Sequence, residues 1–443
     1  MQIRHLGINV PYLTGNPQIT LFKVVYRRHS NFSMESIQQT FHNDIGFDKT
    51  ITSTISRNGD LVSRMYVEIN PKTIIGNGKG TWSGNDSTQI CSYFGNCLLK
   101  EVKFEIGGQI IDKLYREWLS VYADLTESNK SQSGGSLIND AEKIRYTVYP
   151  ERLRQVPHNW QKMSFNVRGF GHPIYEKYES TTSMDIHNAQ IPLPFWFCRN
   201  PGLALPIIAL QNHEVKLTIT TATREECINP ISSSSLLNSE NFKLWIDYIY
   251  LDTDERRRFA QVSHEYLIEQ VQRNTFPENK KKFELNFSHP VKELIWGLSP
   301  KPLNNGPNAS IMAPPNTPHT ESQSILSKDY DSGFNVHDSE NTIQINFNNN
   351  IRVQPRHPNY FTNCQVWQNH TGCGGAVNPD SIFIYSFALK PEEHQPSGFC
   401  NFSKINKVEL ITKNTVEYPV TVFAVNYNLL RIMSGMGGLA YST

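Results

Sequence analysis

The sequence predicts an all-β fold made of two similar modules. Short stretches in which apolar and polar residues alternate run through the whole chain, helical periodicity is scarce, and four landmarks recur in the same order in both halves. Alternation with a period of two is typical of strands with one buried face, because successive side chains of a strand point to opposite faces of the sheet. Half-buried strands of this kind are characteristic of antiparallel sheets.

The clearest alternating stretches each place several apolar side chains on one face: Leu61–Ile69, Val102–Ile106, Val215–Ile219, Leu244–Tyr248 and Val420–Ala424. Gly107-Gly108 separates two of the predicted strands, Glu101–Ile106 and Gln109–Leu114, and its length and chemistry predict a tight hairpin. The best helical candidate is Arg116–Thr126, in which the apolar residues share one face.

An internal repeat indicates a duplicated module. His29 with Thr40-Phe41 recurs as His264 with Thr275-Phe276, at the same internal spacing. The remaining landmarks pair Val62–Pro71 with Val291–Pro300, His213–Leu217 with Lys407–Ile411, and Phe242–Asp252 with Val420–Arg431. We therefore expect an N-terminal arm (1–22), a first module (23–252), a linker (253–262) and a second module (263–443). Antiparallel modules of this size must close or cover their sheet edges, which jelly rolls and barrels do.

Composition excludes several classes of protein. The 443 residues carry 42 Lys+Arg against 41 Asp+Glu, so no net field attracts a polyanion, and we expect no direct contact with nucleic acid. No window is apolar for long enough to predict a transmembrane helix, and no secretory signal is evident. Seven cysteines without a CxxC motif fit reduced thiols in a cytosolic protein better than a disulfide framework.

No catalytic constellation is evident, and we predict no catalytic site, no cofactor and no metal. His213-Glu214 and His264-Glu265 do not extend to HExxH, and both lie in strand-like pattern. Cys364 and Cys373, near His357 and His370, resemble a metal cluster only in composition. Gly435–Gly438 follows a strand with no helix after it, so we interpret it as a segment of close backbone approach rather than a phosphate loop.

Two basic clusters stand out, Arg256-Arg257-Arg258 and Lys280–Lys282. Acidic residues flank both, so we interpret them as a solvated linker and a solvated strand entry. The alternative for Arg256, Arg257 and Arg258 is contact with a neighbouring subunit or a minor protein, since Arg is enriched at interfaces. Seven Asn-x-Ser/Thr sequons are most simply chance in an Asn-rich chain, and the candidates for glycosylation among them are Asn85, Asn129 and Asn308.

Long collinear motifs resemble the major capsid proteins of nucleocytoplasmic large DNA viruses. The motifs are Tyr12–Thr20, Tyr26–Arg28, Asn31-Phe32, Glu35–Gln39, Ser56–Leu61, Glu105–Gln109, Asn200–Pro206, Leu251–Arg256, His264–Gln270, Tyr385–Pro391, Gln395–Gly398, Cys400–Ser403, Asn426–Asn428 and Leu430–Tyr441. They extend from about residue 12 to the C-terminus. Residues 1–11 depart from the family's usual Gly-rich opening, and 70–89 and 126–187 match none of its motifs.

The resemblance implies two tandem eight-stranded jelly rolls with long loops and a few short helices. It also implies a homotrimer that forms pseudo-hexagonal capsomers, which tile an icosahedral shell over an internal membrane in the virion. The implied partners are neighbouring capsomers, minor capsid and penton proteins, and the inner membrane approached by the N-terminal arm. Assembly in the host cytoplasm is implied as well. The alternative from another class is a carbohydrate-binding jelly-roll protein, in which Trp82, Trp160 or Trp367 would stack on sugars.

Overall fold

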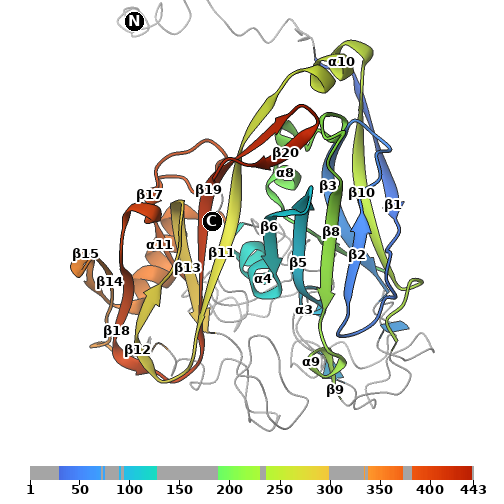
Figure 1. The fold of residues 1–443 in the computed structure, drawn as a ribbon. Helices are drawn as coiled ribbons and strands as arrows, with labels where there is room; N and C mark the ends of the chain where they lie inside the picture. The colour runs from blue at the N-terminus through green and yellow to red at the C-terminus, as the bar shows by residue number, and fades with distance from the viewer. Residues whose placement is uncertain are drawn as a thin grey trace, which may run out of the picture.

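The computed structural model describes residues 29–70, 73–74, 89–90, 94–126, 188–229, 236–298, 334, 338–372 and 382–441. These residues form two β-sandwiches that lie side by side, with short helices around and between them (Figure 1). Within these ranges, no helix combines the length and apolar character needed to cross a membrane. The prediction of an all-β chain with a few short helices is therefore confirmed.

The first sandwich consists of two four-stranded antiparallel sheets. The first sheet has the order β1 (Phe32–Gln39), β10 (Phe242–Leu251), β3 (Leu61–Ile69) and β7 (Ala189–Pro192). The second has the order β2 (Thr50–Thr54), β8 (Val215–Thr221), β5 (Leu99–Ile106) and β6 (Gln109–Tyr115). A separate two-stranded ribbon pairs β4 (Gln89–Ile90) with β9 (Ile228–Asn229).

The second sandwich repeats this plan. One sheet has the order β11 (His264–Phe276), β19 (Val420–Met433), β13 (Pro290–Leu298) and β16 (Phe383–Ser386), and it is extended by β17 (Cys400–Asn401) and β20 (Met436–Leu439). The other sheet has the order β12 (Lys280–Leu285), β18 (Val408–Val416), β14 (Ile343–Phe347) and β15 (Asn350–Arg356).

Both sandwiches are eight-stranded jelly rolls. When the eight sandwich strands of each unit are numbered in chain order, the two sheets have the orders 1-8-3-6 and 2-7-4-5 in both units. The four landmarks of the repeat lie in or beside the first, third, seventh and eighth strands of each unit. The repeat therefore reflects equivalent strands, and the predicted pair of jelly rolls is confirmed.

The helices lie mainly at the ends of strands. They are α3 (Phe94–Leu98), α4 (Arg116–Thr126), α8 (Trp196–Arg199), α9 (Arg224–Cys227), α10 (Thr253–Gln261) and α11 (Gln365–Asn369), with a π-helical turn, η6, at Tyr360–Cys364. The predicted bounds of α4 are confirmed, and its apolar face is buried through Trp118, Leu119 and Leu125. That face packs against the second sandwich, where the ring of Trp118 lies 5.5 Å from that of Phe423.

The hydrophobic core of the first sandwich continues into the second. The larger cluster joins residues of the first sandwich to Ile268, Ile295 and Phe423 on one sheet of the second, while a separate cluster fills the interior of the second sandwich. The sheet that contains β19 is consequently covered on both faces. Nine consecutive residues of β19, Val420 to Asn428, are buried. The expectation that Val420–Ala424 is a half-buried strand was wrong, because the first sandwich covers the face that would otherwise meet water.

The predicted hairpin at Gly107-Gly108 is confirmed, since β5 pairs with β6 across this turn and both glycines have positive φ, 58° and 82°. A Cβ at Gly107 would lie 2.3 Å from Nδ1 of His213, whereas nothing lies within 4 Å of one at Gly108. We expect Gly107→Ala to cost about 2–4 kcal/mol of stability and Gly108→Ala only about 1 kcal/mol. Thermal unfolding of the two variants checks this, and equal losses would contradict the role of His213.

Candidate functional site: the joint between the two sandwiches

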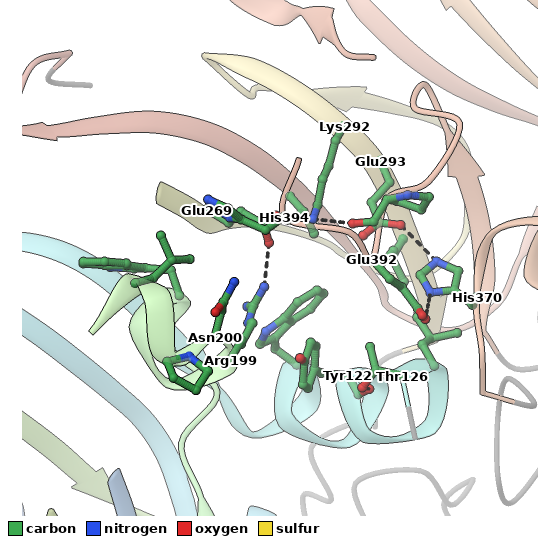
Figure 2. Close-up of a pocket in the computed structure, with 18 residues that line it drawn as sticks. Tyr122, Thr126, Arg199, Asn200, Glu269, Lys292, Glu293, His370, Glu392 and His394 are labelled. Atoms are coloured by element: carbon green, nitrogen blue, oxygen red, sulfur yellow. Dashed lines mark hydrogen bonds and ion pairs between the residues drawn. The ribbon is translucent and has the colours of Figure 1, made fainter. Parts of the chain in front are cut away.

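A cavity of about 400 Å³, lined by both charged and apolar side chains, lies where the two sandwiches meet. Its walls come from α4 and α8 of the first sandwich and from β11, β13 and residues 391–394 of the second (Figure 2). The charged side chains among its lining residues are Arg199, Glu269, Lys292, Glu293, His370 and Glu392, with His394 beside them. The joint therefore places several ionisable groups in surroundings that are largely closed to water.

Glu269 of β11 binds two cations at once. Its Oε2 lies 2.7 Å from Nη1 of Arg199, at the end of α8, and its Oε1 lies 2.7 Å from Nζ of Lys292 on β13. The Lys292 side chain is 3% exposed and that of Glu269 is 8% exposed. Lys292 also donates a hydrogen bond to the carbonyl of Pro391, at 2.5 Å. Ion pairs this deeply buried are stable only when they are well aligned and their remaining donors are satisfied.

His370 lies between two carboxylates. Its Nε2 is 3.0 Å from Oε2 of Glu293, and its Nδ1 is 3.0 Å from Oε1 of Glu392 (Figure 2). Burial alone would lower the pKa of His370, but the charges and hydrogen bonds of the two carboxylates outweigh burial and raise the pKa to about 9. Burial also acts to raise the pKa of Glu293, which the charge of His370 nevertheless holds below its usual value. The imidazole is therefore charged at neutral pH and donates to both sides.

Hydrogen bonds to backbone carbonyls tie the residues after His370 to α4. The hydroxyl oxygen of Thr371 lies 3.0 Å from the carbonyl oxygen of Thr126 and 2.9 Å from Oε2 of Glu392, and its one proton can be donated to either. The amide of Gly372 donates to the carbonyl of Leu125 at 2.7 Å, and the amide of Thr371 donates to Oε1 of Glu392 at 3.0 Å. The His370 cluster thus fixes a segment of the second sandwich to the C-terminal end of a helix of the first.

A second set of contacts joins β6 to β11. Asp112 is buried on β6, where burial raises the pKa of its carboxyl to about 7 against the opposing charge of Arg199. Its Oδ1 accepts a 3.4 Å hydrogen bond from the amide of Val271, and Gln270 donates to the carbonyl of Ile111. Side-chain and backbone groups of the two sandwiches therefore also contact each other between β6 and β11.

The glycine-rich C-terminal segment contributes to the same joint. The amide of Asn212 donates to the carbonyl of Gly435 at 2.9 Å, and Gly435 has a φ of 81°. A Cβ at Gly435 would lie 2.7 Å from Nδ2 of Asn212, and one at Gly437 would lie 2.7 Å from Cδ2 of Leu210. The predicted close backbone approach at Gly435–Gly438 is therefore confirmed, and it is an approach to the first sandwich.

The arrangement is suited to holding two rigid units at one angle. Arg199, Lys292 and His370 each lie in contact with a carboxylate of this cluster, so the charges compensate one another inside the joint. Glu269, Lys292 and Glu293 were not predicted from the sequence as members of a site. Adjacent Lys292 and Glu293 within the otherwise apolar strand 290–298 were the available signal, since charged residues in a buried strand need partners.

The predicted linker residues form helix α10, between β10 and β11. The side chain of Asp252 caps its N-terminus by accepting from the amide of Thr253 at 2.8 Å. Arg256, Arg257 and Arg258 are exposed on this helix. Nε of Arg256 lies 3.0 Å from Oδ1 of the buried Asp60 at the start of the first sandwich's third strand. The structure thus gives Arg256 a partner from the same chain that flanking acidic residues did not suggest.

The other sequence candidates are dispersed. His213 lies two residues before β8, and His264 begins β11. His357 contacts the carbonyl of Asp338 and not the residues around His370 that are described above. Cys373 lies outside the described residues. Among the described residues, no three His, Cys, Asp or Glu side chains are grouped to hold a metal. Asn85, Asn129 and Asn308, like Trp82 and Trp160, lie outside the described residues, whereas Trp367 is exposed on α11.

The basic triplet Lys280–Lys282 lies at the start of β12, as expected for a strand entry. All three side chains are exposed. The ammonium group of Lys282 nevertheless lies 2.7 Å from Oε1 of Glu409, which is buried and which Lys407 also contacts at 2.7 Å. One lysine of this triplet is therefore part of an ion pair across the sheet.

Comparison with known proteins connects this architecture to viral capsids. A family described as "Major capsid protein N-terminus" matches residues 20–252, and one described as "Large eukaryotic DNA virus major capsid protein" matches residues 255–438. The chain is 41% identical to the major capsid protein of Pyramimonas orientalis virus, over 100% of this chain and 98% of that protein. It is 35% identical to that of Paramecium bursaria Chlorella virus 1, with the same coverage of both chains.

Solved structures agree. A chain of the quasi-atomic model of the PBCV-1 virus capsid superposes with a TM-score of 0.67 at 33% identity, covering 96% of this chain and 100% of that one. The Faustovirus major capsid protein shares the fold, with a TM-score of 0.62 at 13% identity over 94% of this chain and 93% of that one. The matches run through both sandwiches and across the joint between them.

Proposed function

Because the chain belongs to the major capsid proteins of large eukaryotic DNA viruses, we propose that three copies form a capsomer of pseudo-hexagonal outline and that these capsomers tile an icosahedral shell. The protein is a structural component of the capsid and not an enzyme. Its task is geometric, since each subunit must present constant faces to its neighbours.

One observation carries this proposal: both sandwiches have the same strand order and are held together by a buried joint. Three such chains around a three-fold axis place six similar blocks in a ring, which is the outline that tiles a surface. A flexible joint would let the blocks change their angle, and the ring would lose its shape. The ion pairs of Glu269 and His370 oppose such movement.

Exposed apolar side chains support the proposal that part of the surface of this protein is buried when copies of it assemble. Phe32 and Met34 are exposed on the edge strand β1, and Trp367 and Leu389 of the second sandwich are both 81% exposed. Aromatic residues and Met are enriched where protein surfaces meet. Because such side chains are exposed on both sandwiches, they support the proposal that each module contacts a neighbouring subunit.

The finer organisation follows from the same proposal. We assign residues 1–22 to an arm that approaches an inner membrane, 23–252 to the first jelly roll, 253–262 to the linker and 263–443 to the second jelly roll. Minor capsid and penton proteins would be the other partners, without direct contact to nucleic acid, and assembly would take place in the host cytoplasm. The near-zero net charge supports the absence of a nucleic-acid partner.

Two groups of residues belong to this proposal. The exposed Arg257 and Arg258, together with Arg256, would contact a neighbouring subunit or a minor capsid protein. Asn85, Asn129 and Asn308 would carry any glycans. Electron microscopy of the assembled particle would place the arginines at a contact or in solvent, and intact mass spectrometry would detect or exclude glycans.

The mass of the purified protein tests the assembly. Three chains of 50.7 kDa give a trimer of about 152 kDa, and we expect native mass spectrometry to find this species at micromolar concentration. A protein that stays monomeric at high concentration and binds glycans would overturn the proposal in favour of a carbohydrate-binding jelly-roll protein.

A further inference from the structure

Two thiols lie in contact at one end of the first sandwich. Cys97 belongs to α3 and Cys227 is the last residue of α9, and their Sγ atoms are 3.8 Å apart. Both side chains are fully buried. A disulfide has an S–S length of about 2.05 Å, so the two sulfurs need to approach by less than about 2 Å to bond. Cys97 and Cys227 are 130 residues apart among the seven cysteines of the chain, so it is the fold and not closeness in sequence that brings them into contact.

The two sulfurs have different partners. Cys227 donates to the sulfur of Cys97, and Cys97 lies 3.6 Å from the carbonyl oxygen of Glu226. The guanidinium of Arg116, at the start of α4, pairs with Glu226 at 3.1 Å beside this contact. Burial would lower the pKa of Arg116, but the negative charges of a Cys97 thiolate and of Glu226 raise it. Arg116 therefore places a positive charge beside the two thiols, and the thiolate is the reactive form of a thiol.

Cys198 shows the effect of burial on another thiol of this protein that lies near an arginine. Burial raises the pKa of the Cys198 thiol to about 12, although Arg199 opposes the shift. Cys198 therefore remains a protonated thiol at neutral pH and serves as the control thiol for Cys97.

We propose that Cys97 and Cys227 form an intrachain disulfide when the protein meets hydrogen peroxide. The Cys97 thiolate attacks one peroxide oxygen, the O–O bond breaks, and the departing hydroxide takes up a proton to become water. Cys97 is then a sulfenic acid. The Cys227 thiol attacks its sulfur, the S–O bond breaks, and a second water leaves with the thiol proton. The two thiols lose two electrons, and one peroxide is reduced to two waters.

The disulfide would fasten α9 to α3 beyond the end of an existing strand pair. The last backbone contact there is the 2.9 Å hydrogen bond from the amide of Ala222 to the carbonyl of Leu98, and the β4–β9 ribbon follows Cys227 directly. A cross-link between residues 97 and 227 also closes a long loop in the unfolded chain, which favours the folded state. This oxidation-dependent lock lies within one subunit and does not depend on the proposed assembly.

The test uses the full chain, purified in reducing buffer and then treated with hydrogen peroxide. Remaining thiols are alkylated before digestion, and mass spectrometry maps the linked peptides. We expect a Cys97–Cys227 peptide that is two hydrogen atoms lighter than its reduced parts. The melting temperature should rise by several degrees and return when a reductant is added. Cys198→Ser should behave like the unaltered protein.

Cys227→Ser should give no linked peptide and should leave Cys97 as a sulfenic acid that dimedone traps. Thermal melting of the reduced variants shows whether each variant is folded. If Cys227→Ser does not fold, the peptide map of the unaltered protein alone tests whether the Cys97–Cys227 disulfide forms. The proposal is overturned if the folded protein shows no Cys97–Cys227 link after treatment, or if Cys91 takes the place of either residue.

Discussion

Replacing Glu269 by Gln is expected to lower the free energy of unfolding by about 3–5 kcal/mol. The carboxylate contacts both Arg199 and Lys292 at 2.7 Å, and the amide cannot balance either charge. The substitution keeps the size of the side chain and leaves two cations in the buried joint. Chemical denaturation of the purified protein, followed by tryptophan fluorescence, measures the loss, and Trp118 and Trp196 beside the cavity report on the joint itself.

Glu265→Gln is the matched control, because Glu265 lies on the same strand, β11, and pairs with Arg431 at 2.8 Å. These two side chains are 55% and 53% exposed, and exposed pairs of this kind contribute only about 0–1 kcal/mol. We therefore expect Glu265→Gln to unfold at nearly the same denaturant concentration as the unaltered protein. Similar losses in the two variants would refute the central role assigned to the joint.

Stability is expected to fall as the pH rises from 6.5 to 9, and His370 is the cause. The folded protein keeps the proton of His370 up to a pKa of about 9, while the unfolded chain releases it near 6.5. The folded state thus binds more protons in this window, so the contribution of His370 to stability is complete below pH 6.5 and is lost as the pH rises through 9. The difference corresponds to about 3 kcal/mol at 1.36 kcal/mol per pKa unit.

Denaturation curves at several pH values measure this slope, and His370→Gln should remove it. The carboxylates of Glu293 and Glu392 would then be left without the cation that lies between them. The buried Asp112 acts in the same direction at lower pH, since its pKa rises from 3.8 to about 7 on folding. A variant at His370 that keeps the full slope above pH 6.5 would assign the effect to another group.

Much of the fold follows from local sequence. The turn at Gly107-Gly108 and the helix at Arg116–Thr126 depend on residues next to one another, which is why their positions were predicted within a residue. The equivalence of the two modules was also predicted from the sequence, because both modules have strands of the same apolar pattern in the same order along the chain. The linker at 253–262 was less clear. Its helix α10 is mainly charged, and only the cap at Asp252 marks its beginning.

The partners of the buried charges were not readable from the sequence. Arg199 and Glu269 are 70 residues apart, and Glu293 and His370 are 77 apart, so no spacing rule connects them. In the sequence, Lys292 and Glu293 are two charges next to an apolar run. Their role depends on the charged side chains that contact them or their neighbours, which come from α8, from the end of α11 and from the loop at residue 392.

The sequence by itself determined the modules: alternation with a period of two specifies strands, its repetition specifies two similar all-β modules, and the resemblance to the capsid family implied that they are jelly rolls. Only the tertiary structure decided how the modules meet. One sheet of the second sandwich is covered on both faces because α4, α8 and β6 of the first sandwich lie against it. Local patterns record which face of a strand is apolar, whereas burial of the opposite face depends on a neighbour that is distant in the chain. The charges of Glu269 and His370 are stable in that joint because the packing of the two sandwiches brings their partners into contact.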